Sequence, residues 1–462
     1  MRVPRIALVL LLLFAGCAKR APYVTPAADT TPTFKEDPNW KAAAPADTAL
    51  KGDWWRAFGD SQLNALEEQI AVSNQTLTAA EAQWLAARAA VRGARAAFGP
   101  QVSTTPSIAR QRLSGTRATG AFHDAYTDFL LPVDVSYEAD VWGRIRENVN
   151  IARANAEAVA ADVESVSLSL HAELATDYFT LRGLDREREL LDNTVAAYQR
   201  ELELTTNRYR GGIASAADVA QAETQLETTR GQAVDVGVAR ASLEHAIAVL
   251  TGRPAATVTL AAMPLDSTVP AVPAVLPSQL LERRPDIAGA ERRVAAADAQ
   301  VGLARTAFYP VLTLSGSAGF EASSFGSWLA SASNFWSIGP ALAVNVFDSG
   351  RRRAAAQQAR AEYVQSTAEY RETVLSAFRE VEDQLAALRI LEEEARIQQS
   401  AVAAAERSLE LANNRYRGGV VSYLEVITAQ SAALTNARTA VGILVRRMNA
   451  TVLLIKALGG RW

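Results

Sequence analysis

The sequence contains one unusual turn motif twice. It reads NRYRGGIAS at 207–215 and NRYRGGVVS at 414–422, an offset of 207 residues. Each copy ends a stretch that begins just after Gly143 or Gly350 and contains no proline. Apolar residues in both stretches recur at helical spacing, and about 65 helical residues make a rod roughly 100 Å long. No ordinary globular domain needs such a rod, so two long helices of equal length are predicted.

The repeated motif has the chemistry of a helix end followed by a helix start. Paired glycines permit the left-handed backbone that ends a helix, and the serine after them can cap the next helix. Each copy is therefore predicted to join two antiparallel helices. An acid three residues after the serine fits the capping-box spacing. These residues are Gly211, Gly212, Ser215 and Asp218 in the first copy, and Gly418, Gly419, Ser422 and Glu425 in the second.

Four segments are predicted to be strands, at 101–113, 128–140, 311–321 and 338–347. In the second segment, apolar side chains alternate with mostly polar ones, which indicates a strand with one apolar face. The apolar face carries Phe129, Leu131, Val133, Val135 and Tyr137, and the other face carries Asp134, Ser136 and Glu138. A single helix is predicted before the first strand, from Asp60 to Phe98. The order helix, two strands, long helix, turn, helix is then predicted a second time.

The first residues indicate export and a lipid anchor. A basic start precedes an apolar run from Ile6 to Phe14, which is too short to span a bilayer. Cys17 is the only cysteine, so no intramolecular disulfide can form. Its position after two small residues resembles the processing box of bacterial lipoproteins. The resemblance implies acyl chains on Cys17 that tether the mature chain to a membrane surface.

Neither the strands nor the helices can complete a structure within one chain. Four strands of about ten residues suit a membrane thickness but cannot close a barrel. An open sheet edge in lipid would leave backbone groups unpaired at a cost of several kcal/mol each. Symmetric self-association removes both problems, because neighbouring copies close the sheet and the helical cylinder together. At least two copies are needed, and three would give 12 strands.

Composition and motif content argue against an enzyme or a nucleic-acid-binding protein. The 462 residues carry a formal net charge of −3 and 49% hydrophobic content, which is typical of folded protein and gives the chain no overall basic excess to steer it to phosphates. His123, His171 and His245 are scattered without ligand spacing, and no nucleophile constellation, paired metal motif or phosphate loop is visible. We therefore expect no catalysis, no cofactor and no metal, with energy supplied by a partner.

Several motifs together resemble the TolC family of outer-membrane efflux proteins, in the lipoprotein branch that serves resistance-nodulation-division pumps. They are the lipoprotein-like start, DWWRAFGDSQLNALEEQI, LLERRPDIAGAERRVAAADAQVGLARTAFYP, YEADVWGR, FDSGR and the two RYRGG turns. The resemblance implies a mainly helical trimer with two tandem repeats per chain, in which a 12-stranded β-barrel continues into a 12-helix periplasmic α-barrel. It also implies an outer-membrane location, with a periplasmic adaptor protein and an inner-membrane efflux pump as partners.

The predicted divisions of the chain follow from the repeats and this resemblance. They are a signal peptide at 1–16, a lipidated strap and equatorial segment at 17–60, a first repeat at 61–254, an equatorial linker at 255–285, a second repeat at 286–458 and a tail at 459–462.

The resemblance places the hairpin tips in the periplasm, at a gate that meets the adaptor. It implies gate roles for Asp218, Glu425, Leu424 and Tyr416. Three like charges near a threefold axis would disfavour tight closure and attract cations. Helix capping by both acids, with a hydrophobic constriction at Leu424, is the alternative. Tyr416 is expected to hydrogen-bond Asp218. Adaptor contacts are expected at Arg210, Gly211, Gly212, Ser215, Arg417, Gly418, Gly419 and Ser422.

Two other functions fit part of the sequence. A periplasmic adaptor also has a long helical hairpin and can be lipidated, but it should carry one hairpin between two halves of a compact β-domain. A hydrolase decorated with helices would need a catalytic motif. As an exit duct, the chain would carry small molecules passively, and the pump and adaptor would choose the cargo.

Overall fold

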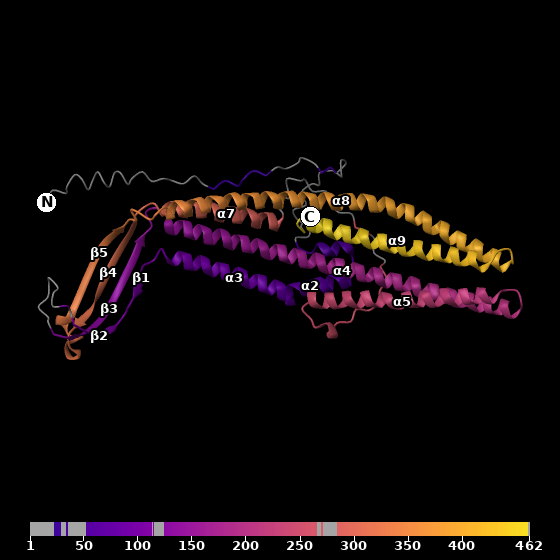
Figure 1. Cartoon of the computed structure of the whole chain (residues 1–462), viewed down its shortest axis with the longest axis horizontal. Helices are drawn as coiled ribbons and strands as arrows, with labels where there is room; N and C mark the ends of the chain where they lie inside the picture. Colours follow the sequence, from indigo (N-terminus) through magenta and orange to yellow (C-terminus); the bar gives the residue numbers. More distant parts are fainter. Residues whose placement is uncertain are drawn as a thin grey trace. The chain divides into compact units, whose positions relative to one another are not determined.

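The computed structural model describes residues 23–28, 34–35, 52–112, 114, 124–265, 269–270 and 284–460. It divides into two compact units. Figure 1 labels the helices and strands in colours that follow the sequence. The first unit contains residues 83–160 and 289–370 together with the described residues up to Ala27. The second contains residues 161–288 and 371–462 with residues 28–82. Cys17, the predicted lipidation site, lies outside the described residues.

The first unit contains an antiparallel sheet. Its strands are β1 (Gln101–Ser103), β2 (Ser107–Gln111), β3 (Tyr126–Ala139), β4 (Val311–Ala322) and β5 (Asn334–Ala343). The strand order is β1-β3-β4-β5, and β2 also pairs with β3, so β1 and β2 share one edge of the sheet. The sheet therefore has four strand positions. Within the described residues, no strand of this chain covers either of its two edges.

The register of this sheet sorts its residues into an apolar and a polar face. Directly opposed residues of an antiparallel pair project from the same face. Val133 lies opposite Ala318, which in turn lies opposite Trp336. The apolar face contains Phe129, Leu131, Val133, Val135 and Tyr137 of β3, Leu312, Leu314 and Phe320 of β4, and Trp336, Ile338 and Leu342 of β5. The other face contains Asp134, Ser136 and Glu138, opposite Ser317, Ser315 and Thr313.

The strand predicted at 338–347 has the wrong boundaries. β5 begins four residues earlier, at Asn334, and ends at Ala343. Ala343 pairs with Val311, the first residue of β4. The residue before Val311 is Pro310, which has no N–H with which to continue the ladder. Residues 344–347 therefore lie outside the strand, although their apolar alternation extends it in the sequence.

The strand predicted at 101–113 is interrupted. It consists of β1 and β2 with residues 104–106 between them. Pro106 cannot donate a backbone hydrogen bond, and the partner strand carries Pro132 near this point. The Thr104 hydroxyl donates to the Pro132 carbonyl over 2.6 Å, which replaces part of the lost ladder.

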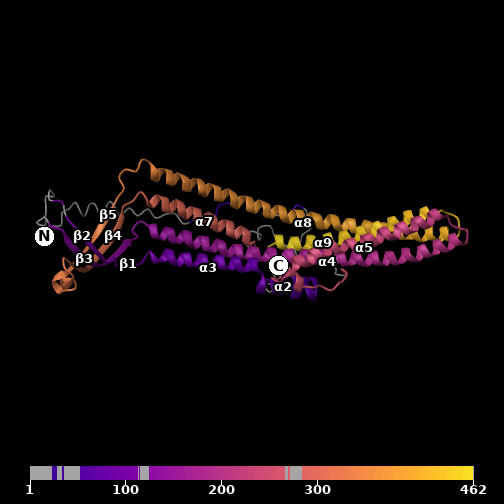
Figure 2. The same cartoon turned by 60° about the horizontal axis from the view of Figure 1, so that its bottom comes forward.

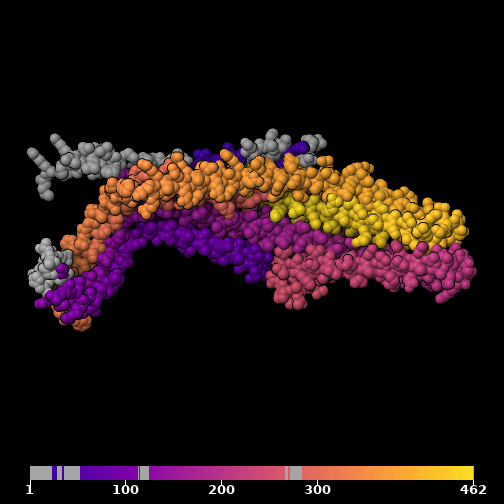
Figure 3. All heavy atoms as spheres, in the orientation of Figure 1, coloured from indigo at the N-terminus to yellow at the C-terminus, as the bar shows by residue number. Residues whose placement is uncertain are grey.

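Two pairs of helices repeat the same lengths. α4 (Arg144–Arg210) and α8 (Arg351–Arg417) have 67 residues each, and α5 (Ala216–Leu250) and α9 (Tyr423–Ala457) have 35 each. The α4–α5 and α8–α9 hairpins run side by side to their tips (Figures 2 and 3). The predicted duplication and its two equal rods are confirmed. Among the described residues, no helix combines the length and apolar character needed to cross a membrane.

The helix predicted from Asp60 to Phe98 is two helices, α2 (Ser61–Ser73) and α3 (Gln75–Ala96). Asn74 separates them with an extended backbone. Its Oδ1 accepts a hydrogen bond from the Leu77 N–H over 2.9 Å, and its Nδ2 donates to the Leu250 carbonyl over 2.8 Å. One amide side chain thus caps α3 and satisfies a carbonyl at the end of α5. In the second half, α7 (Pro285–Thr306) has 22 residues, as α3 does, and corresponds to α3.

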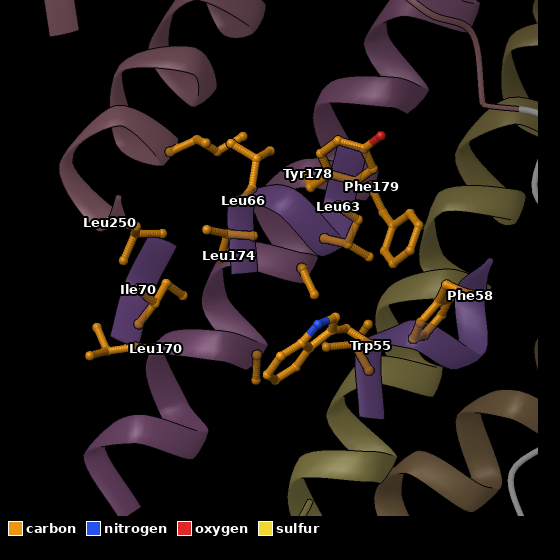
Figure 4. Packing of buried hydrophobic residues seen from close by; sticks show 14 of the residues in the cluster. Trp55, Phe58, Leu63, Leu66, Ile70, Leu170, Leu174, Tyr178, Phe179 and Leu250 are labelled. Atoms are coloured by element: carbon orange, nitrogen blue, oxygen red, sulfur yellow. The ribbon is translucent and has the colours of Figure 1, made fainter. Parts of the chain in front are cut away.

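The second unit contains a hydrophobic core around α2 and the short helix η1 (Trp54–Phe58), shown in Figure 4. The DWWRAFGDSQLNALEEQI motif supplies η1 and most of α2, and both elements pack against α4, α5 and α9. Residues labelled in the figure are Trp55, Phe58, Leu63, Leu66, Ile70, Leu170, Leu174, Tyr178, Phe179 and Leu250. Asp60 orients α2, because Oδ1 accepts from the Gln62 and Leu63 N–H groups and Oδ2 accepts from the Tyr178 hydroxyl.

Arg284 explains why RRPDI occupies the start of α7. Its buried guanidinium binds Asp286 at 2.7 Å and Glu380 of α8 at 2.8 Å. It also donates to the carbonyl of Ala457, the last residue of α9, over 2.9 Å. One arginine therefore holds three helix segments of the second unit together, and the C-terminal carbonyl of α9 gains a cationic partner.

A buried acid and a histidine meet inside the same core. The Glu67 side chain is fully buried, and its Oε2 lies 2.6 Å from His171 Nδ1. The His171 ring stacks on Trp55 with centroids 4.4 Å apart. Burial raises the pKa of Glu67 to about 9 and lowers the pKa of His171 to about 4. Burial therefore favours the neutral form of both groups, in which the protonated carboxyl donates to the imidazole.

Replacing Glu67 by Gln should flatten the pH dependence of stability. Unfolded Glu loses its proton near its ordinary pKa, so between about pH 4.5 and 9 the folded chain holds the extra proton and stability falls as pH rises. His171 contributes the opposite slope, but only below its ordinary pKa. Between pH 6.5 and 8 the wild type should lose about 2 kcal/mol that Glu67→Gln retains. Thermal unfolding at both pH values measures this difference.

The neighbouring exposed acid supplies the control for this substitution. Glu68 is largely exposed and pairs with Arg56 at 3.2 Å. Glu68→Gln should leave the wild-type pH profile unchanged. If the stability of Glu67→Gln and that of the wild type change in parallel with pH, Glu67 does not hold the extra proton.

Candidate functional site: the paired hairpin tips

The two turns have nearly identical backbones. In the first, the N–H groups of Gly211, Gly212 and Ile213 donate to carbonyls of the last turn of α4, over 2.8 to 3.0 Å. The equivalent N–H groups after α8 do the same over 2.9 to 3.0 Å. Gly212 and Gly419 both have a φ of 74°, which favours glycine. The repeated glycines are therefore explained by helix termination.

The two predicted gate acids lie in different local environments. Asp218 forms a capping box with Ser215: its carboxylate accepts from the Ser215 N–H over 3.0 Å, and the Ser215 hydroxyl accepts from the Asp218 N–H over 3.2 Å. Ser422 makes no such side-chain cap. Glu425 instead pairs with Arg415 across its own hairpin at 3.3 Å and remains half exposed. Identical spacing in sequence thus gives two different arrangements.

The expected hydrogen bond between Tyr416 and Asp218 is absent from the described residues, so this prediction is wrong. Tyr416 is buried, and its hydroxyl has no hydrogen-bond partner in the described part of the chain. Its ring packs against Tyr423 with centroids 5.2 Å apart. Asp218 is already occupied by its cap, so the tyrosine enters the apolar cluster between the hairpins instead.

Arg208 and Glu201, two charged residues that the sequence did not single out, connect the hairpins together with Arg417. The Arg208 guanidinium lies over the Tyr416 ring, 5.0 Å from its centroid, and donates to the Arg417 carbonyl over 3.1 Å. Arg417 in turn approaches the buried Glu201, with Nη2 4.0 Å from Oε2. The only hint in the sequence is that Arg208 belongs to the repeated motif. Its counterpart Arg415 stays within its own hairpin, so the repeat does not predict the cross-contact.

Burial dominates the electrostatics of this contact. Burial raises the pKa of Glu201, while Arg417 and Arg208 oppose that rise. Burial, followed by the charge of Glu201, also raises the pKa of the Tyr423 hydroxyl. The two hairpins therefore meet through both polar and aromatic contacts, which include Arg208, Arg417 and Glu201 and the rings of Tyr416 and Tyr423.

The remaining tip residues are solvent-exposed. All of the predicted adaptor-contacting residues are exposed, namely Arg210, Gly211, Gly212, Ser215, Arg417, Gly418, Gly419 and Ser422. Leu424 is 59% exposed. The apolar residue after each glycine pair was not predicted, yet Ile213 and Val420 are 69% and 70% exposed. Both repeats place an apolar residue directly after the glycine pair, and this match could have identified the two residues from the sequence. Each tip thus offers an apolar contact beside an arginine.

The described residues contain no group of three or more His, Cys, Asp or Glu side chains arranged to hold a metal ion. His171 is committed to Glu67, and His123 lies outside the described residues.

The chain thus combines an amphipathic antiparallel sheet in one unit with two helical hairpins of equal length. Comparison with known proteins identifies the family. Residues 66–253 and 276–460 match the family model described as outer membrane efflux protein. The chain belongs to this family.

Individual relatives support the same conclusion. The chain is 31% identical to the toluene efflux pump outer membrane protein TtgC of Pseudomonas putida over 453 residues, which cover 97% of this chain and 94% of that protein. It is 32% identical to the pyoverdine export outer membrane protein OpmQ of Pseudomonas aeruginosa over 428 residues, covering 91% and 90%. The solved outer-membrane channel OprN matches with a TM-score of 0.89 at 28% identity, covering 96% of this chain and 100% of that one.

The predicted family, fold class and outer-membrane efflux function are therefore confirmed, and the adaptor alternative is not favoured. Members of this family are trimeric outer-membrane channels that extend into the periplasm and work with periplasmic adaptors and inner-membrane pumps, which agrees with the predicted partners.

Proposed function

We propose that this chain forms a passive exit duct for small molecules, gated at its hairpin tips and tethered through Cys17. The sheet register carries the proposal: it gathers apolar residues on one face and polar residues on the other over β3, β4 and β5. Such a sheet suits lipid on one side and water on the other. Its two uncovered edges would be paired by neighbouring copies, so a solute could leave without meeting lipid.

Transport through this duct needs no chemistry within the chain. The charged residues at the hairpin tips are engaged in helix capping, ion pairing and packing. They carry no arrangement of nucleophile and base. The chain is therefore proposed to have no enzymatic activity and to depend on a partner pump for energy.

The gate is proposed to lie where Asp218, Glu425 and Leu424 approach the threefold axis. Neither acid is buried, so each can contribute negative charge to a water-filled opening. Three copies of each acid would attract cations and oppose tight closure. Leu424 follows Tyr423 at the start of α9 and supplies an apolar ring at the same level.

Removing both acids tests this gate. Asp218→Ala with Glu425→Ala should lower the cation preference of single channels about twofold or more, because the charge at the narrowest point is lost. Reversal potentials in a salt gradient across a planar bilayer measure the preference. A matched control removes two exposed acids away from the tips, Asp235→Ala with Glu406→Ala, and should leave selectivity unchanged.

An unchanged cation preference in the tip variant would remove the acids from the gate. In that case Leu424→Ala should raise the conductance, because the constriction would be apolar.

A further inference from the structure

All four connections between strands and long helices lie at one end of the sheet. Gln101, at the start of β1, pairs with Ser136 near the end of β3. Ala139, the last residue of β3, pairs with Leu312 of β4, and Val311 pairs with Ala343, the last residue of β5. The helices α3, α4, α7 and α8 therefore all meet the sheet at this end.

This end of the sheet is strongly basic. The segments 92–100, 140–146, 303–310 and 344–353 contain eight arginines and two aspartates, Asp140 and Asp348. The net charge of these segments is +6 within a chain whose total is −3, and Glu138, which pairs with Arg144 at the same end of the sheet, lowers it to +5. We call the eight arginines the arginine belt: Arg92, Arg95, Arg144, Arg146, Arg305, Arg351, Arg352 and Arg353.

Most of the belt is available to a partner outside the chain. Three members are held by local acids: Arg144 by Glu138, Arg146 by Asp140 and Arg352 by Asp348. The other five are exposed and form no ion pair with the described residues: Arg92, Arg95, Arg305, Arg351 and Arg353.

Aromatic residues accompany the belt. Trp142 stacks on Tyr309 with centroids 5.0 Å apart, and the Arg352 guanidinium lies over the Phe308 ring at 5.4 Å. Phe98, Phe308 and Tyr309 are 42 to 43% exposed, and Phe347 is 83% exposed. Aromatic girdles mark the level of lipid headgroups around membrane strands. The arginines therefore lie at headgroup level.

Among the residues that the structure describes, the opposite end of the sheet has no such excess. Its described residues include Arg110 and Arg112 together with Asp124, Asp128 and Glu321. The charge asymmetry between the two ends indicates that the two membrane surfaces are recognised differently.

We infer that the arginine belt binds the phosphate groups of anionic phospholipids in the leaflet that faces the periplasm. Guanidinium groups match phosphate oxygens in a bidentate geometry, and clustered arginines beside a membrane favour anionic over zwitterionic lipid. The inference rests on the proposed function, because an outer-membrane duct with periplasmic helices places this end of the sheet at the inner leaflet. Lipid bound there would seat the sheet at a defined depth.

Native mass spectrometry of the purified trimer tests the inference. The trimer is mixed with equal amounts of phosphatidylglycerol and phosphatidylcholine that carry the same acyl chains, and retained lipids are counted. The wild type should retain about fivefold more phosphatidylglycerol, and Arg305→Gln with Arg351→Gln and Arg353→Gln should reduce this preference at least about threefold. The control Arg200→Gln with Arg379→Gln and Arg407→Gln removes three exposed arginines of α4 and α8 and should keep the preference.

Equal retention of both lipids by the wild type, or an unchanged preference in the belt variant, would overturn the inference. Single-channel conductance in pure phosphatidylcholine separates this failure from failure of the proposed function. If the wild type conducts but shows no lipid preference, only the lipid-binding role of the arginine belt is contradicted. If the wild type does not conduct, the proposed function as an exit duct is contradicted.

Discussion

Replacing Asp185 by Leu should lower the free energy of unfolding by about 3 to 5 kcal/mol, because it leaves buried cations without their partner. The Asp185 side chain is 2% exposed, and that of Arg182 is 1% exposed. Asp185 Oδ2 accepts from Arg182 over 2.8 Å and from the Met263 N–H over 3.0 Å. Its Oδ1 accepts from Arg240 over 2.7 Å.

This network connects the segment after α5 to the long helices of the second unit. Arg182 also donates to the Ala261 carbonyl and to Gln62, and Arg240 donates to the Leu260 carbonyl. Removal of Asp185 would leave the Arg182 and Arg240 guanidinium groups without their shared carboxylate in a poorly solvated site. Leucine cannot satisfy the Met263 N–H either, so a donor is orphaned as well.

The same helix offers a matched control. Arg188 and Asp192 pair at 2.9 Å on α4, but both side chains are about half exposed. Asp192→Leu should therefore cost at most about 1 kcal/mol. Urea unfolding of the full-length protein in detergent, followed by circular dichroism, compares the two variants. If both substitutions lower the free energy of unfolding by the same amount, water reaches the Asp185 network as freely as it reaches the surface.

Replacing Val133 by Arg should cost about 2 to 4 kcal/mol if this residue lies near the middle of the bilayer. Val133 is in the central part of β3, on the apolar face of the sheet, opposite Ala318. It is 46% exposed, so a charge introduced there would lie at the surface of the sheet. The folded fraction in lipid vesicles, read from heat-modifiable migration over a urea series, measures the cost.

Ser136→Arg supplies the comparison, because Ser136 lies in the same strand on the polar face, opposite Ser315. Water on that face would keep the added charge solvated, and the cost should be small. If both variants fold equally well, the assignment of the apolar face to lipid is wrong.

The features predicted from sequence are those set by local chemistry. Absence of proline and recurrence of apolar residues predict α4 and α8, and paired glycines predict their ends at Arg210 and Arg417. Alternation in β3 predicts its two faces, which the register with β4 then extends across the sheet. In these cases the residues of the element itself are enough to predict its type and its ends.

The features missed depend on residues far apart in the chain. The break at Asn74 needs the Leu250 carbonyl, 176 positions away, and an uninterrupted helical pattern gives no sign of it. The position of Arg208 over Tyr416 likewise depends on how two hairpins pack. β5 ends at Ala343 because of where its partner begins, so alternation beyond that residue misled the prediction.

The equal length of α4 and α8 restricts how this protein can change during evolution. Each helix has 67 residues, and their ends meet through Arg208, Tyr416 and the Arg417 carbonyl. Loss of one heptad from a single helix would shift its tip by about 10 Å and separate these partners. Insertions and deletions should therefore be inherited in pairs, one in each half of the gene, so that the reach of the protein across the periplasm changes only in matched steps.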